Sequence, residues 1–167
     1  MKFSTQNLLS IRDWQTHAEV YQNAVTECRL ADELGFDVVW LAEHHFSQYG
    51  ICPSLAPLAG AIAAATRRVR IGTAVVIAPF EHPLRIAEEW AEIDILSGGR
   101  LSMTEEKALD QAAIAGDAEE VADKIRMHRE ALEVTHFMGA FSRGGLAHDK
   151  VIRSMRLFAE KVIPKVR

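Results

Sequence analysis

Two nearly uninterrupted apolar runs stand out in the first half of this 167-residue chain. Residues 36–42 read FDVVWLA, and residues 69–77 read VRIGTAVVI. Such runs are typical of strands that are buried on both faces of a parallel sheet. Residues 1–9 form a shorter, apolar-leaning segment that predicts a further strand.

Segments with helical spacing separate these strands. Apolar residues recur on one face of residues 14–34, with Asp13 as the expected N-cap and Gly35 as the expected end of the helix. Residues 54–66 are rich in small apolar side chains and predict a helix that packs closely on a sheet. Residues 85–96 predict a third helix, which ends at a Ser-Gly-Gly sequence.

The last third of the chain continues the alternation after a polar stretch. A very short strand is expected over residues 100–103. Asp117 is expected to cap a helix over 118–132, and a strand over 134–141 and a helix over 148–162 follow. Strand and helix in alternation predict right-handed βαβ units, and therefore an α/β fold with a parallel sheet or barrel.

Composition narrows the function classes. Apolar residues make up 49% of the chain, enough for one sizeable core. The net charge of −4 argues against a nucleic-acid surface, and we find no apolar run of about eighteen residues that could span a membrane. The first residues lack the pattern of a signal peptide, and the two cysteines form no disulfide framework or metal motif, so we expect a cytoplasmic protein.

Ionisable residues follow the predicted strands. The run of 36–42 leads directly into Glu43, His44 and His45. Parallel strands bring their carboxyl ends to one edge, where sites form in such folds. If the strand continued, the two histidines would point to opposite faces. One could then act as a base or hydrogen-bond donor while the other supported the backbone or paired with Glu43. A purely structural role at a strand end is the alternative, and a metal site is the poorer reading.

Two other strand ends could also contribute to a site. The small residues of GTAVVI would let a flat ligand lie against the backbone, although composition alone favours a packed core strand. Arg143, before Gly144 and Gly145, could hold an anion through its guanidinium and nearby backbone N–H groups. An ordinary loop with a solvated arginine is the competing interpretation.

The motifs together resemble the bacterial luciferase-like monooxygenases, a family of flavin-dependent (β/α)8 barrels. The resemblance runs over residues 1–101 and resumes over 113–167. The resemblance rests on the segments LADELGFDVVWLAEHHFSQYGICPS, TRRVRIGTAVVIAPFEHPLRIAEEWAEIDILSGGRL, GDAEEVADKI and HFMGAFSRGGLAHDKVIRSMRLFAEKVIP.

The resemblance implies roles for individual residues. His44 corresponds to the histidine beside the reactive edge of the flavin, which assists the reaction of reduced flavin with O2. Glu43 is similar to the acidic neighbour at that strand end, and His45 to its structural partner. Ala74 and Val75 match the place where the family often has a non-proline cis peptide beneath the flavin ring. Weaker expectations for contacts to flavin or substrate fall on Ser142, Arg143 and Gly144.

The sequence departs from the family after residue 101. The expected glycine- and arginine-rich loop for the flavin phosphate is missing, as are strands four to six with their helices. A complete barrel needs about 250 residues. We therefore expect a single truncated domain over 1–167, an incomplete TIM-type barrel with five or six parallel strands, whose amino-terminal units span 1–101 and carboxy-terminal units 113–167.

Such an open barrel has three possible origins: a natural short relative, a chain with its middle removed, or a sequence that skips part of the full polypeptide. In each case exposed strand edges and apolar faces favour association. We expect a homo-oligomer, or pairing with a longer homologous subunit.

The resemblance implies a flavin-dependent monooxygenase. It would use reduced FMN and O2 to oxidise a small organic substrate, for example an aldehyde; a deazaflavin is a further option for the cofactor. The alternative is a non-catalytic flavin-binding or assembly protein derived from that family. A metal-dependent hydrolase on a related barrel is a third hypothesis.

Overall fold

Five parallel strands form the sheet of the computed structural model, which describes residues 1–102, 117–132, 135–142 and 146–167. Within these residues the strand order is β4-β3-β2-β1-β5. The strands are β1 (Lys2–Asn7), β2 (Val38–Leu41), β3 (Arg70–Thr73), β4 (Leu101–Ser102) and β5 (His136–Gly139). The first strand is thus an interior strand, and it pairs with both β2 and β5. The result is part of a TIM-like barrel, as the sequence predicts.

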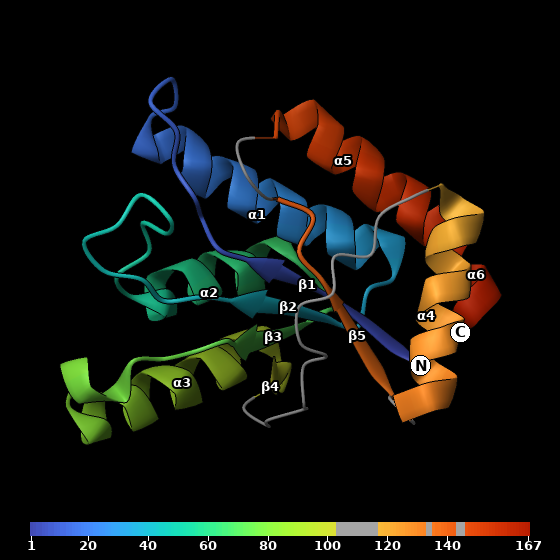
Figure 1. Cartoon of the computed structure of the whole chain (residues 1–167). Coiled ribbons are helices and arrows are strands. Elements are labelled where there is room, and N and C mark those ends of the chain that lie inside the picture. Colours follow the sequence, from blue (N-terminus) through green and yellow to red (C-terminus); the bar gives the residue numbers. More distant parts are fainter. Residues whose placement is uncertain (103–116, 133–134, 143–145) are drawn as a thin grey trace.

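Helices connect the strands and cover the sheet (Figure 1). They are α1 (His17–Leu34), α2 (Leu55–Ala65), α3 (Pro83–Ser97), α4 (Ala118–Leu132) and α5 (His148–Leu157). A π-helical turn, Phe158–Val162, continues α5 into α6 (Ile163–Val166), and a short 3-10 turn, Ala78–Phe80, precedes α3. No helix in the described part of the chain is both long and apolar enough to cross a lipid bilayer.

The helix boundaries differ modestly from the sequence-based prediction. Thr16, rather than Asp13, caps α1: its hydroxyl accepts the N–H of Glu19, while the Glu19 carboxylate accepts the N–H of Thr16. This reciprocal capping box satisfies the N–H groups of Thr16 and Glu19 and sets the start of the helix at His17. Gly35 ends α1 in the left-handed conformation, as expected.

The strands are shorter than predicted. β2 occupies only the middle of 36–42, and β3 ends at Thr73 instead of continuing to residue 77. Apolar character alone does not distinguish a strand from a buried loop at the end of a strand. Residues 74–77 consequently belong to the loop that follows β3, where their backbone can contact other segments.

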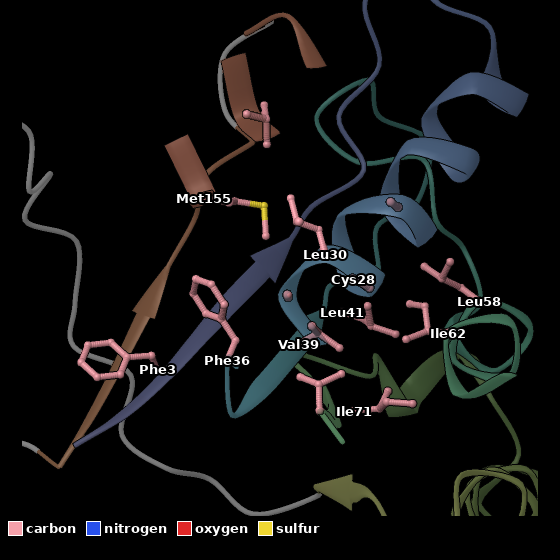
Figure 2. Packing of buried hydrophobic residues seen from close by; sticks show 14 of the residues in the cluster. Phe3, Cys28, Leu30, Phe36, Val39, Leu41, Leu58, Ile62, Ile71 and Met155 are labelled. Atoms are coloured by element: carbon pink, nitrogen blue, oxygen red, sulfur yellow. The ribbon is translucent and has the colours of Figure 1, made fainter. Parts of the chain in front are cut away.

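The main core lies between the sheet and the helices. Side chains alternate along a strand, so Phe3, Val39 and Ile71 share the face that the helices cover. Figure 2 shows these residues packed against Cys28 and Leu30 of α1 and the apolar side of α2. Phe158 closes the carboxy-terminal side of this core, with its ring centre 5.9 Å from that of Phe3.

The opposite face of the sheet is more polar. The Ser4 hydroxyl and His136 Nε2 are 2.7 Å apart across β1 and β5, and both residues are buried. Trp40 lies against Gly72 of β3, where an added Cβ would come within 2.4 Å of the indole ring. A side chain larger than hydrogen at residue 72 would therefore displace Trp40.

Arg100 joins the ends of several elements. Its guanidinium donates to the carbonyl oxygens of Ala63 (2.9 Å), Val69 (2.9 Å) and Ser97 (2.7 Å), and to the Thr66 hydroxyl (2.8 Å). The carbonyl groups at the end of a helix lack partners within that helix. A single side chain thus satisfies carbonyls at the ends of α2 and α3 and fixes both helices beside β3.

Asp32 makes a second clamp, between α1 and the loop that leads into β3. Its carboxylate accepts the backbone N–H groups of Arg67 (3.1 Å), Arg68 (2.7 Å) and Val69 (2.6 Å). Burial raises the pKa of Asp32, but the three N–H donors and the nearby Arg68 cation outweigh it, so that the pKa lies below its usual value. The ionised carboxylate therefore stabilises the folded state.

We expect Asp32→Ala to lower the free energy of unfolding by about 3 kcal/mol at pH 7, because three hydrogen bonds to a charged group are lost. A carboxyl group with a lowered folded-state pKa contributes its stability above its unfolded pKa of about 3.9, and loses it as pH falls further. The difference between the variant and the parent chain should therefore narrow below about pH 4. Urea unfolding across this range measures it.

Glu33→Ala, which removes an exposed carboxylate on the same helix, is the matched control and should change stability by less than about 0.5 kcal/mol. Equal losses of unfolding free energy in the two variants would contradict the stabilising role of the Asp32 hydrogen bonds.

Candidate functional site

The carboxyl end of β2 delivers three ionisable residues to one edge of the sheet. β2 ends at Leu41, and the chain turns out of the sheet before Glu43, His44 and His45. The alternation that would send the two histidines to opposite faces therefore does not apply to them. In Figure 1 the loops after β2 and β3 extend from the same end of the sheet.

Glu43 ties these two loops together. Its side chain is almost completely buried, and one carboxylate oxygen lies 2.7 Å from Nε2 of His45. The other oxygen accepts the N–H of Ile77 at 3.0 Å, while the Glu43 N–H donates to the Val75 carbonyl at 3.3 Å. A buried carboxylate needs such partners to offset its desolvation. Of the roles that the sequence left open for the second histidine, the structure shows pairing with Glu43, and it shows it for His45.

His44 is held from three sides. Its N–H donates to the Cys52 carbonyl at 2.9 Å, and its ring meets that of Tyr49 edge to face, with 5.1 Å between ring centres. Gly50 lies directly against the ring, since a Cβ built there would be 2.2 Å from His44 Cδ2. Nε2 is buried and has no hydrogen-bond partner among the described residues. Buried polar atoms are rarely left unpaired, so this nitrogen is a natural contact point for a ligand.

The loop after β3 lies next to this group. Ala74 donates its N–H to the Leu41 carbonyl at 2.7 Å, and the Ala74–Val75 peptide bond is cis, at the place where the resemblance implies such a bond. Val75 and Phe80 expose 64% and 63% of their surface. The ring of Phe80 packs edge to face against His45, at 4.8 Å between centres. The ionisable residues thus adjoin an exposed apolar surface.

The remaining predicted residues are placed only in part. Ser142 is half-buried just beyond β5, whose parallel pairing with β1 puts its carboxyl end at the same edge. Arg143 and Gly144 lie outside the described residues. His82 caps α3, with Nδ1 accepting the Leu84 N–H at 3.2 Å. No three His, Cys, Asp or Glu side chains group as metal ligands in the part of the chain that the structure describes.

Residues 1–104, which make up more than half of the chain, match the family model described as luciferase-like monooxygenase. The chain belongs to the luciferase-like monooxygenase family. It is 36% identical, over 104 residues, to the oxygenase component of the flavin-dependent trigonelline monooxygenase of Acinetobacter baylyi. The match covers 62% of this chain and 29% of that protein, so the chain spans less than a third of this curated relative.

Solved structures of monooxygenases share the fold. The monooxygenase RslO1 from Streptomyces bottropensis superposes with a TM-score of 0.90 over 100% of both chains, at 16% identity. The oxygenating constituent of 3,6-diketocamphane monooxygenase from Pseudomonas putida, solved with FMN, gives a TM-score of 0.59. That match covers 97% of this chain and 39% of the other, again at 16% identity. The fold of this chain therefore has a solved counterpart that superposes over its full length.

The sequence did not reveal the residues that support His44. Tyr49, Gly50 and Cys52 follow it within the same loop, but no periodic pattern marks them. The available signal was the glycine itself, which commonly marks a close approach of the backbone to another group. Which group it approaches is visible only in three dimensions.

We expect Gly50→Ala to displace the His44 ring, because the new methyl group would also lie 2.7 Å from the Leu8 carbonyl oxygen and has no room to shift. The measurement is an NMR spectrum of ring-labelled histidine, in which the His44 signal should move while that of His17, which is exposed at the start of α1, stays in place.

Gly60→Ala is the control, since Gly60 lies within α2 and an added Cβ meets nothing within 4 Å. It should leave the His44 signal unchanged and raise the melting temperature slightly, as alanine is the better helix former by about 1 kcal/mol. An unmoved His44 signal in Gly50→Ala would show that the ring does not depend on this glycine.

Proposed function

We propose that this chain is a flavin-dependent monooxygenase that uses reduced FMN and O2 to oxidise a small organic substrate, for example an aldehyde. The observation that carries the proposal is the buried Nε2 of His44, which has no hydrogen-bond partner among the described residues and lies next to the contacts between Glu43 and the loop that follows β3. Membership of the luciferase-like family and the FMN bound to a solved relative support it.

The residues at this edge fit a flavin. A flavin ring presents polar atoms along one edge and flat apolar faces. His44 supplies a buried ring nitrogen for the polar edge, and Val75 supplies exposed apolar surface together with the backbone of Ala74. The Ser142, Arg143 and Gly144 segment is the proposed contact for an anionic group of the cofactor or substrate.

Each residue then has a defined task. Bound reduced flavin would supply the electrons that activate O2. Nε2 of His44 donates or accepts a proton at the flavin edge, and the contacts with Tyr49 and Gly50 keep the ring in place. Glu43 orients His45 and holds the loop after β3 through Ile77. Val75 and Phe80 offer apolar surface that bound flavin or substrate would cover.

A non-catalytic flavin-binding or assembly protein is the second candidate. It is favoured by the extent of the chain, which covers only 29% of the trigonelline monooxygenase component. With five strands in the described residues, one side of the proposed pocket depends on groups beyond this sheet. Loss of catalysis with retention of flavin would fit that arrangement.

To test the enzyme, the chain is titrated with oxidised and reduced FMN, and aldehyde oxidation is followed with a separate flavin reductase. We expect saturable FMN binding, and we expect His44→Asn to lower the oxidation rate at least about 100-fold, because a general acid–base residue typically contributes that much. FMN affinity should change far less than the rate.

His17→Asn is the matched control and should retain the parental rate, since His17 is exposed at the start of α1. If the chain binds no FMN, it is not a flavin-dependent monooxygenase on its own. Saturable binding without oxidation of any aldehyde tested would favour the binding protein instead.

We also propose that the chain associates, as a homo-oligomer or with a longer homologous subunit. Phe46, Val75, Phe80 and Leu84 each expose more than half of their surface near the candidate site. Clustered apolar side chains of this kind mark interaction surfaces. Within the described residues, β4 also lies at an edge of the sheet, where another chain could cover it.

Light scattering of the purified chain should therefore give a mass of at least twice the 18.6 kDa of one chain. Replacing Phe46 and Phe80 together by Ser should lower that mass, whereas the polar-surface change Lys150→Ser on α5 should not. A monomer that binds no hydrophobic dye would contradict association.

A further inference from the structure

A pocket of about 560 Å³ lies at the amino ends of the strands, at the end of the sheet opposite to the candidate site. Its lining includes Lys2, Val38 and Arg70, the first residues of β1, β2 and β3. Arg167 also lines it, and Figure 1 places both chain ends at this side of the sheet. The volume lies within the range of roughly 300–1,000 Å³ that is usual for small-molecule sites.

The lining is strongly basic. Among the described residues that line the pocket are four cationic side chains, Lys2, Arg68, Arg70 and Arg167, and one carboxylate, Asp37, although the chain as a whole has a net charge of −4. The Asp37 carboxylate is already engaged: it accepts the Phe3 N–H at 2.7 Å and lies 4.0 Å from the Arg167 guanidinium. Positive charge is thus concentrated where the rest of the protein is mildly acidic.

Strand register explains why these cations converge. Ser4 is paired with Val38, and Val38 with Arg70, in parallel ladders. Paired residues share a face and side chains alternate along a strand, so Lys2 and Arg70 project from the same face of the sheet. Arg68 and Arg70 each donate one hydrogen bond to a backbone carbonyl, of Asp32 and Leu101 respectively. A guanidinium has five N–H donors, so these bonds orient both groups while leaving capacity for a ligand.

We propose that this pocket binds a small phosphorylated molecule. Guanidinium groups pair with phosphate oxygens in a planar, two-pronged geometry, and several around one pocket favour a multiply charged anion over a single carboxylate. Ser102 adds a residue with a hydroxyl donor to the same lining. Because the pocket lies at the amino ends of the strands, it is separate from the proposed flavin site at their carboxyl ends.

The probe for the test is inorganic pyrophosphate, titrated into the full chain by calorimetry at ~150 mM salt, where exposed long-range electrostatics are largely screened. We expect saturable binding with a stoichiometry of one. The double variant Arg70→Gln/Arg167→Gln should weaken it about tenfold or more, because charge-assisted hydrogen bonds are lost.

Arg153→Gln/Arg156→Gln, on the exposed side of α5, removes the same charge and should keep the affinity within about twofold. Circular dichroism melting of each variant separates loss of binding from loss of folding. A folded double variant that binds as well as the parent chain would overturn the proposal, and so would equal weakening in both variants.

A competition experiment keeps this inference distinct from the proposed function. Saturating pyrophosphate should leave an FMN titration unchanged, and citrate should bind more weakly than pyrophosphate. Displacement of FMN by pyrophosphate would place the anion in the flavin site and overturn the proposal. Absence of pyrophosphate binding would overturn it as well, without affecting the monooxygenase.

Discussion

The buried carboxylate of Glu43 is the contact on which the arrangement of the candidate site depends. It reaches His45 with one oxygen and the backbone of Ile77 with the other, and so joins the exits of two neighbouring strands. The loops that follow β2 and β3 contain little regular secondary structure of their own, so contacts between them must hold their positions. A charge kept out of water must be fully partnered, which makes this junction intolerant of any displacement of the two loops. The position of His44 follows, because it is the next residue along the chain.

The sheet and its helices could largely be predicted from the sequence, because apolar runs and helical spacing reflect burial directly. The ends of elements could not: Thr16 caps α1 through a contact three residues away, and β3 stops at Thr73 within a continuous apolar run. At the site, pairing of one histidine with Glu43 was among the alternatives that the adjacent residues allowed, but the sequence did not say which histidine. The contacts of His44 with Tyr49 and Gly50 were not, because they depend on how a non-repeating loop folds back.

The family relationship and the fold rest on different parts of the comparison. Residues 1–104 match the family, yet the chain covers less than a third of the trigonelline monooxygenase component. The superposition with RslO1 over the whole of both chains shows that this reduced fold is shared by another protein. Arg100 and Asp32 illustrate how it is held: each satisfies several backbone groups at once, at the junctions between helices and strands.

The place of β1 between β2 and β5 has a consequence for biosynthesis. β1 is translated well before one of these two neighbours, because β5 ends only at Gly139. Until that segment emerges, one edge of β1 has no partner strand and Phe3 lacks its contact with Phe158. Pairing of β1 with β5 must therefore follow translation through residue 139, and the nascent protein exposes an unpaired strand edge until then. Slower translation would lengthen the time for which this edge can pair with another chain.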